Sequence, residues 1–225
     1  MSHAAKYYIA GVVCVGLLLL AGCLIRSWQP VDALRFESYL GVATLASTFK
    51  IRLPGMEGSI SLNFMMYLIC IGARTLTETV LMASVATLVQ ALWRPKTKPT
   101  AVKILFNVSA LLISVTGAYF ASRQMHLTGT QVPALVIAAT VLFVLNSWLV
   151  SIVIALTTGA SLTGIWRNCN RWTFTYYMMG AGVAVMVIAY SRVVGWSQAL
   201  ALLPAAYLIY VYCDGYIKRE REAHA

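Results

Sequence analysis

Three asparagines are the residues of this sequence whose type and placement best suit the binding of a small molecule. Asn63, Asn107 and Asn146 each lie inside an apolar segment. An amide in hydrocarbon is costly unless it is hydrogen-bonded, so these side chains are expected to face protein or a cavity. Either they bond between helices and fix a bundle, or they line a ligand pocket. We name them as the candidate ligand-binding residues.

Acidic side chains deep in an apolar segment would indicate proton-coupled transport. Glu37 and Glu78 come nearest to that description, and both lie close to the ends of apolar segments. Glu78 follows Arg74 by four residues, which is the spacing of a helical ion pair if the backbone is continuous there. A satisfied ion pair at the membrane edge and a proton site are the two interpretations.

Enzyme chemistry lacks the residues that it would need. The sequence holds no HExxH, GxSxG, P-loop or GxGxxG motif, and its histidines (His3, His126 and His224) are far apart. We therefore expect no catalytic activity, no metal site and no cofactor. None of the cysteines forms a CxxC pair, so they are interpreted as small buried hydrophobic residues: Cys14, Cys23, Cys70, Cys169 and Cys213.

The composition places this chain in a membrane. Of its 225 residues, 60% are hydrophobic and 11% are charged, whereas soluble domains carry roughly a quarter charged residues. A soluble globule would have too little polar surface, and lipid is the solvent that suits this composition. The net charge of +10 is attributed to Lys and Arg beside cytoplasmic membrane ends, and nucleic acid is not an expected partner.

A membrane span needs roughly 20 apolar residues, so the chain has room for about eight spans and no sizeable soluble domain. The sequence predicts one transmembrane domain over residues 1–225, an all-α polytopic bundle with a 33–212 core and a cytoplasmic tail, 213–225. The first span, 8–25, either belongs to this bundle or is peripheral to its core. The expected spans are Tyr8–Ile25, Ala33–Thr48, Ser59–Ala73, Leu76–Trp93, Ala101–Ala121, Val132–Thr157, Thr173–Ala189 and Trp196–Tyr212.

Positive charge supports this topology and predicts that both termini are cytoplasmic. Lys and Arg number 17, of which twelve fall in the segments assigned to the inside and five in those assigned to the outside. The inside residues are Lys6, Lys50, Arg52, Arg94, Lys96, Lys98, Lys103, Arg167, Arg171, Lys218, Arg219 and Arg221. The outside residues are Arg26, Arg35, Arg74, Arg123 and Arg192.

Three local patterns carry further predictions. Ser59, Ser61 and Asn63 recur at every second residue, so the start of the third span is expected to be irregular or wet. The late aromatic cluster, which includes Tyr176 and Tyr177, is interpreted chiefly as interfacial anchoring. Leu20-Ala21-Gly22-Cys23 matches a lipoprotein signal-peptidase box, and an ordinary first span and a lipidated Cys23 both remain open.

Several segments, in their order and spacing, resemble the membrane-associated sensor region found at the N-terminus of bacterial HD-GYP phosphodiesterases and cyclic-di-GMP signalling proteins. The resemblance covers most of the chain from about Arg35 onward. The segments are Lys50-Ile51-Arg52-Leu53-Pro54, Ser59-Ile60-Ser61-Leu62-Asn63-Phe64, Ile104-Leu105-Phe106-Asn107, Leu145-Asn146-Ser147 with Val150-Ser151, Trp166 with Trp172, and Pro204.

The resemblance implies a bacterial inner-membrane sensor module that binds a small or lipophilic ligand and couples to a cytoplasmic signalling protein. No HD pair or GGDEF-like segment occurs, so cyclic-di-GMP chemistry is not implied, and the module is expected to stand alone or to work with a separate partner. The alternative is a substrate-binding subunit of a vitamin-type membrane transporter, which rests on fold-level analogy. The sequence predicts no oligomeric state.

Overall fold

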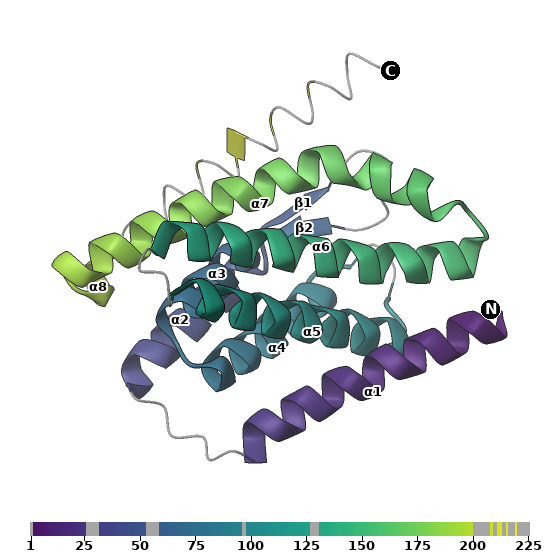
Figure 1. The fold of residues 1–225 in the computed structure, drawn as a ribbon, viewed down its shortest axis with the longest axis horizontal. Coiled ribbons are helices and arrows are strands. Elements are labelled where there is room, and N and C mark those ends of the chain that lie inside the picture. Colours follow the sequence, from purple (N-terminus) through teal and green to yellow (C-terminus); the bar gives the residue numbers. More distant parts are fainter. Residues whose placement is uncertain are drawn as a thin grey trace.

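The structure is a computed structural model that describes residues 2–25, 32–52, 59–95, 98–126 and 131–199, with isolated positions beyond residue 199. Helices dominate it, and they lie side by side in one bundle (Figure 1). In chain order the elements are α1 (His3–Ile25), α2 (Ala33–Ala46), β1 (Lys50–Arg52), β2 (Ser59–Ser61), α3 (Asn63–Ala73), α4 (Leu76–Leu92), α5 (Ala101–His126), α6 (Gln131–Thr158), α7 (Leu162–Val193) and α8 (Trp196–Ala199).

Hydrogen bonds between segments distant in the sequence define two ends of the bundle. At the first end, where α1 begins and α6 ends, Ser2 Oγ donates to the Leu156 carbonyl at 3.1 Å. Lys50 Nζ donates to the carbonyl of Trp93, so β1 lies beside the end of α4. At the opposite end, Arg74 Nη2 donates to the Asp32 carbonyl at 3.4 Å. Successive helices therefore run up and down the bundle (Figure 1).

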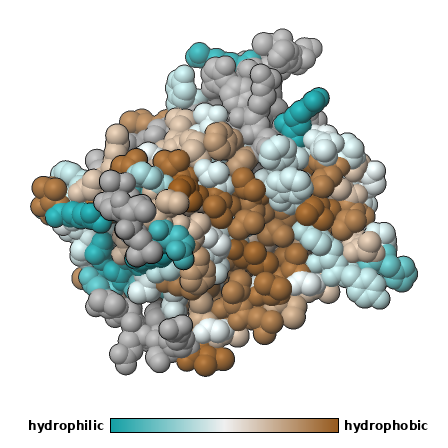
Figure 2. All heavy atoms as spheres, in the orientation of Figure 1, coloured by the Kyte–Doolittle hydropathy of each residue, from teal (hydrophilic) through white to brown (hydrophobic). Residues whose placement is uncertain are grey.

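Four of the described helices are long and apolar enough to cross a membrane: His3–Ile25, Ala101–Met125, Gln131–Thr158 and Thr173–Val193. The expectation of a helical, multi-pass membrane protein is confirmed. Figure 2 shows the surface that this requires, with hydrophobic side chains over the middle of the face and hydrophilic ones gathered toward its left and right. The count of eight spans and the cytoplasmic termini stay predictions.

The third predicted span, Ser59–Ala73, differs most from the prediction. Its first three residues form β2, which pairs antiparallel with β1 so that Lys50 faces Ser61. A strand places alternate side chains on one face, which explains the serine spacing and confirms the irregular start. The helix itself, α3, has 11 residues and rises only about 16 Å, roughly half of the hydrocarbon thickness.

Other boundaries shift by smaller amounts. The helix α2 has 14 residues and ends at Ala46, and α7 has 32 residues, beginning well before the predicted Thr173. Of the eighth predicted span, Trp196–Tyr212, the structure describes the first turn as α8, while most of the remainder and of the 213–225 tail lies outside the described residues.

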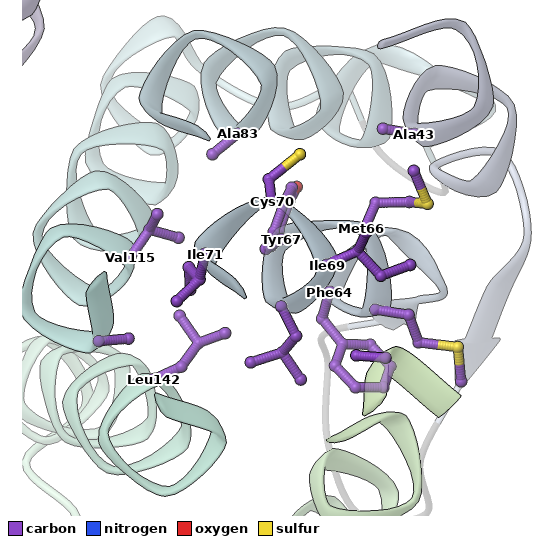
Figure 3. Close-up of a cluster of buried hydrophobic side chains, with 14 of the residues drawn as sticks. Ala43, Phe64, Met66, Tyr67, Ile69, Cys70, Ile71, Ala83, Val115 and Leu142 are labelled. Carbon is purple, nitrogen blue, oxygen red and sulfur yellow. The ribbon is translucent and has the colours of Figure 1, made fainter. Parts of the chain in front are cut away.

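The core is built around α3 (Figure 3). Every residue from Asn63 to Ile71 is buried, because α2, α4, α5, α6 and α7 all pack against this helix. Phe64 packs 4.6 Å from the Tyr176 ring and 4.9 Å from the Tyr177 ring, between centroids. A Cβ at Gly180 would lie 2.1 Å from Phe64 Cε2, so glycine is required for this approach of α3 to α7.

The packing corrects two predictions from the sequence. Tyr176 and Tyr177 are each 6% exposed, so they fill the core and do not anchor an interface, because the ring of Phe64 covers them. Cys14 is exposed, whereas Cys70 is buried as predicted. Cys14 lies on α1, whose outer face has no protein against it, so its surroundings are those of a lipid-facing residue.

Candidate functional site

A polar cluster surrounds the beginning of α3, with Asn63 at its centre. The Asn63 amide accepts a hydrogen bond from Ser61 Oγ at 2.6 Å and donates to Ser47 Oγ at 3.3 Å and to Gln90 Oε1 at 2.9 Å. Asn63 is 3% exposed, and both serines are buried. Four elements thus meet at one amide, which satisfies the requirement for bonding of a buried polar group. We call Ser47, Ser61, Asn63 and Gln90 the amide cluster.

The other two asparagines do not join Asn63. Asn146, on α6, is half-buried and forms a side-chain hydrogen bond with Tyr177 on α7. Asn107, on α5, is exposed. The prediction that Asn107 faces the bundle interior is wrong, because the face of α5 that is buried carries its neighbours Phe106 and Val108 instead. The three asparagines share no hydrogen-bonding partner, and ligand binding by them stays a prediction.

A second polar cluster lies where α3 ends and α4 begins. Arg74 leaves the helical conformation, with φ −128° and ψ 177°, and Thr75 caps α4. The Arg74 guanidinium nevertheless pairs with Glu78 Oε1. Glu78 Oε2 accepts from Thr75 N at 3.1 Å and from Thr75 Oγ1 at 2.9 Å, completing a capping box.

This ion pair is enclosed by protein. The Arg74 side chain is 6% exposed and that of Glu78 is 2% exposed. Every oxygen of Glu78 has a partner, as a buried carboxylate requires. The geometry is that of a satisfied structural pair, and it forms although the helix is interrupted at Arg74 and Thr75.

Two further arginines approach the same place from α2 and α5. Arg123 Nη2 donates to the Arg74 carbonyl at 3.3 Å and to Tyr119 Oη at 3.1 Å. Arg35 Nη2 donates to Tyr39 Oη at 3.4 Å. Each guanidinium also lies over a ring, that of Arg123 5.0 Å from the centroid of Tyr119 and that of Arg35 5.5 Å from that of Tyr39. We call Arg35, Arg74, Glu78 and Arg123 the arginine cluster.

The sequence contains a pattern that could have indicated the arginine cluster, although the count of positive charges did not reveal it. All five basic residues assigned to the outside are arginines, whereas every lysine falls in a segment assigned to the inside. Arginine presents a rigid fork of donors that suits carboxylates and phosphates, and lysine does not. The restriction to arginine therefore indicated a specific role beyond the general bias.

Chemically, the donors and acceptors of the two clusters suit polar or anionic ligands. No group of three or more His, Cys, Asp and Glu that could hold a metal ion occurs in the part of the chain that the structure describes. Glu37, the other acidic candidate, is exposed on α2. The helix α3 runs between the two clusters, with the amide cluster at its beginning and the arginine cluster at its end.

Comparison with protein families gives one match. The MASE9 family model matches residues 33–214, which begins at α2 and leaves out α1. Comparison with curated proteins gave no match, and comparison with solved structures gave none either. Because the match covers most of the chain, and because helices of membrane-spanning length surround a buried α3 within it, the chain belongs to MASE9, a family of membrane-associated sensor domains.

Proposed function

We propose that this chain is a non-catalytic sensor module that binds a small or lipophilic ligand within the helical bundle and couples to a cytoplasmic signalling protein. The observation that carries the proposal is the MASE9 match over residues 33–214. The membrane sensor character belongs to the family, and the ligand and the partner are our extension of it.

The arrangement of α3 supports a coupling role. This helix contacts α2, α4, α5, α6 and α7, and it runs from the amide cluster at its beginning to the arginine cluster at its end. A ligand shifts a protein between states only by binding them with different affinities. A ligand that displaces α3 from either end would disturb the bonds at the other, since 11 residues of helix move as one unit.

We further propose an inner-membrane location in a bacterium, eight spans, and the first end of the bundle in the cytoplasm. Lys6, Lys50, Arg94, Lys98 and Lys103 belong to segments at the first end, and positive residues favour the cytoplasmic side. Reporter fusions at Lys98 and at the C-terminus are expected to be active in the cytoplasm, and one at Arg123 outside. An external C-terminus would mean an odd number of spans and would contradict this topology.

The coupling proposal is tested by removing the tail. A chain without residues 216–225 is expected to insert and to bind ligand, but to lose its cytoplasmic partner in a detergent pull-down. The matched control replaces the same residues by Gly and Ser, which preserves length. Gly215 precedes this segment and would serve as a hinge, since glycine lowers helix stability by about 1 kcal/mol relative to alanine. Equal partner recovery from all three chains would refute coupling through the tail.

The same pull-down separates the sensor from the vitamin-type transport subunit. A transport subunit is expected to retain an ATPase and a coupling protein, whereas a sensor retains a signalling enzyme. Recovery of the ATPase from native membranes would replace the sensor proposal by the transport one.

A further inference from the structure

The arginine cluster contains positive charge and hydrogen-bond donors that the protein itself does not use. Arg74 Nε and Arg35 Nε are both buried and have no hydrogen-bonding partner among the described residues. The Arg74 side chain is more than nine-tenths buried. A buried charged donor without an acceptor is costly, and such groups call for an explanation by an ion, a ligand or water.

The two residues with unused donors lie together. Arg74 donates to the Asp32 carbonyl at 3.4 Å, and the Asp32 carboxylate accepts from Arg35 N at 3.0 Å. Arg123 joins them through its hydrogen bond to the Arg74 carbonyl. Three arginines from three elements therefore lie at the opposite end of the bundle, linked to one another through Asp32 and the Arg74 carbonyl.

Charge at this place is unbalanced. Three arginines face two carboxylates, those of Glu78 and Asp32, and both carboxylates already cap helices. The N-termini of α2 and α4 add about half a positive charge each, and the C-termini of α3 and α5, where Arg74 and Arg123 lie, add about half a negative charge each. The excess is thus about one positive charge, which favours an anionic ligand.

The three arginines of the cluster differ in how exposed their side chains are. Arg123 is exposed, Arg35 is half-buried and Arg74 is buried. Arg123 is three residues from the end of α5, so the cluster lies at headgroup depth if α5 spans the membrane. The rings of Tyr39 and Tyr119 lie beneath two of the guanidinium groups and hold these planar groups in place.

From these observations we propose that Arg35, Arg74 and Arg123 form a binding site for a phosphate oxyanion. Arginine forks bind phosphate with charge-assisted, frequently bidentate hydrogen bonds. The phosphate comes either from a free anion on that side of the membrane or from a lipid headgroup. The proposal names a ligand class for the proposed sensor, but the site itself can be tested without any partner.

The test uses the full chain and two sources of phosphate. Titration of the detergent-solubilised protein with inorganic phosphate measures binding of the free anion. Chloride is exchanged for phosphate so that the ionic strength stays constant. Native mass spectrometry of protein from nanodiscs of phosphatidylglycerol or of an uncharged glycolipid measures a retained headgroup. Arg35→Gln and Arg123→Gln avoid the buried ion pair, and Arg192→Gln is the matched control, an exposed arginine in the last turn of α7.

We expect Arg35→Gln and Arg123→Gln each to weaken phosphate binding about tenfold, the effect of losing one charge-assisted hydrogen bond, and Arg192→Gln to leave it unchanged. If the protein retains phosphatidylglycerol but does not bind inorganic phosphate, and if the two variants lose this retention, the site belongs to a lipid headgroup. Absence of both, or an equal loss in Arg192→Gln, would overturn the proposal. If Arg35→Gln does not fold, Arg123→Gln alone decides, because its side chain is exposed. A negative result for phosphate binding does not change the expected recovery of a partner through the tail. The phosphate site and the coupling proposal can therefore be refuted independently.

Discussion

The helices α1 and α3 are opposites in almost every respect. The helix α1 has 23 residues, and only 17% of its most apolar window is buried against protein. It lies along one side of the bundle (Figure 1) and outside the MASE9 match. The helix α3 has 11 residues, is buried along nearly its whole length, and ends in a polar cluster on each side.

This difference separates two roles that hydropathy does not distinguish. A long apolar helix is stable in lipid whatever touches it, because its backbone groups are bonded internally. A short helix preceded by strands is tolerated at membrane depth only where protein encloses it, as protein encloses α3. Among the four described helices of membrane-spanning length, the most apolar one, α1, is therefore the least buried, whereas the short helix α3 forms the centre of the core.

The largest effect is expected at the end of α3. Glu78→Leu leaves the Arg74 guanidinium buried without its carboxylate, and breaking a buried pair costs about 3–5 kcal/mol. The free energy of unfolding in bicelles should fall by that amount. Glu37→Leu, at an exposed acidic residue of α2, is the control and should change little.

A double variant sharpens this prediction. Arg74→Met with Glu78→Leu removes both charges, and replacing a buried pair by apolar residues is often neutral or stabilising. Most of the stability lost in Glu78→Leu should return. A double variant as unstable as Glu78→Leu would show that the capping of α4 by Glu78, and not the ion pair, dominates.

The second prediction compares side chains on the two helices directly. Phe64→Ala opens a cavity against Tyr176, Tyr177 and Gly180, and large-to-small core changes of this kind cost about 3–5 kcal/mol. Leu18→Ala, at a position of α1 that is 66% exposed, should cost less than about 0.5 kcal/mol. Thermal and denaturant unfolding both measure the difference. Similar losses at the two positions would remove the contrast between α1 and α3.

The third prediction concerns the contact that holds α1 to the bundle. A Cβ at Gly16 would lie 2.3 Å from Ser109 Cβ and 2.5 Å from Ser109 Cα, whereas one at Gly11 would meet nothing within 4 Å. Gly16→Leu should therefore overpack the α1–α5 contact at a cost of about 1–3 kcal/mol, and Gly11→Leu should not. Equal unfolding free energies would show that α1 does not lie against α5 at this point. A peripheral first span predicts that Gly16→Leu leaves the 33–212 core folded.

The fold was predictable where a segment's structure depends mainly on its own residues. Apolar length and Lys/Arg asymmetry placed α1, α4, α5 and α6 to within a few residues, because lipid solvation and charge act on each segment separately. The larger differences are at the beginning of α1 and the end of α5, where each helix is five residues longer than predicted. The alternation of Ser59, Ser61 and Asn63 also indicated a break in helical structure, which β2 confirms. The enclosure of α3 was not predictable, because it depends on contacts with five helices, three of which (α5, α6 and α7) are distant in the sequence.

The site was predictable only in part, for the same reason. The sequence identified Asn63 and the Arg74–Glu78 pair from residue type and spacing. It did not identify Ser47 and Gln90 as partners of Asn63, nor Arg35 and Arg123 as neighbours of Arg74, because each comes from another element. It also placed Asn107 inward, because a polar residue in an apolar run does not reveal on which face of its helix it lies.

The smallest effects are expected at the three asparagines, and they rank by partner number. Asn63→Leu leaves Ser47, Ser61 and Gln90 without their shared partner, which should cost about 1–2 kcal/mol of unfolding free energy, toward the upper range of interhelical hydrogen bonds in membranes. Asn146→Leu loses one bond, to Tyr177, and should cost about 0.6 kcal/mol. Asn107→Leu, on an exposed face, should be neutral or slightly stabilising in lipid, because it removes an amide from hydrocarbon. The three variants have the same change of side chain, so only the surroundings differ.

A loss of stability at Asn107 as large as that at Asn63 would contradict this ranking. It would show that Asn107 contacts something other than lipid, such as a second copy of the chain, and cross-linking of the protein in its native membrane would then identify the contact.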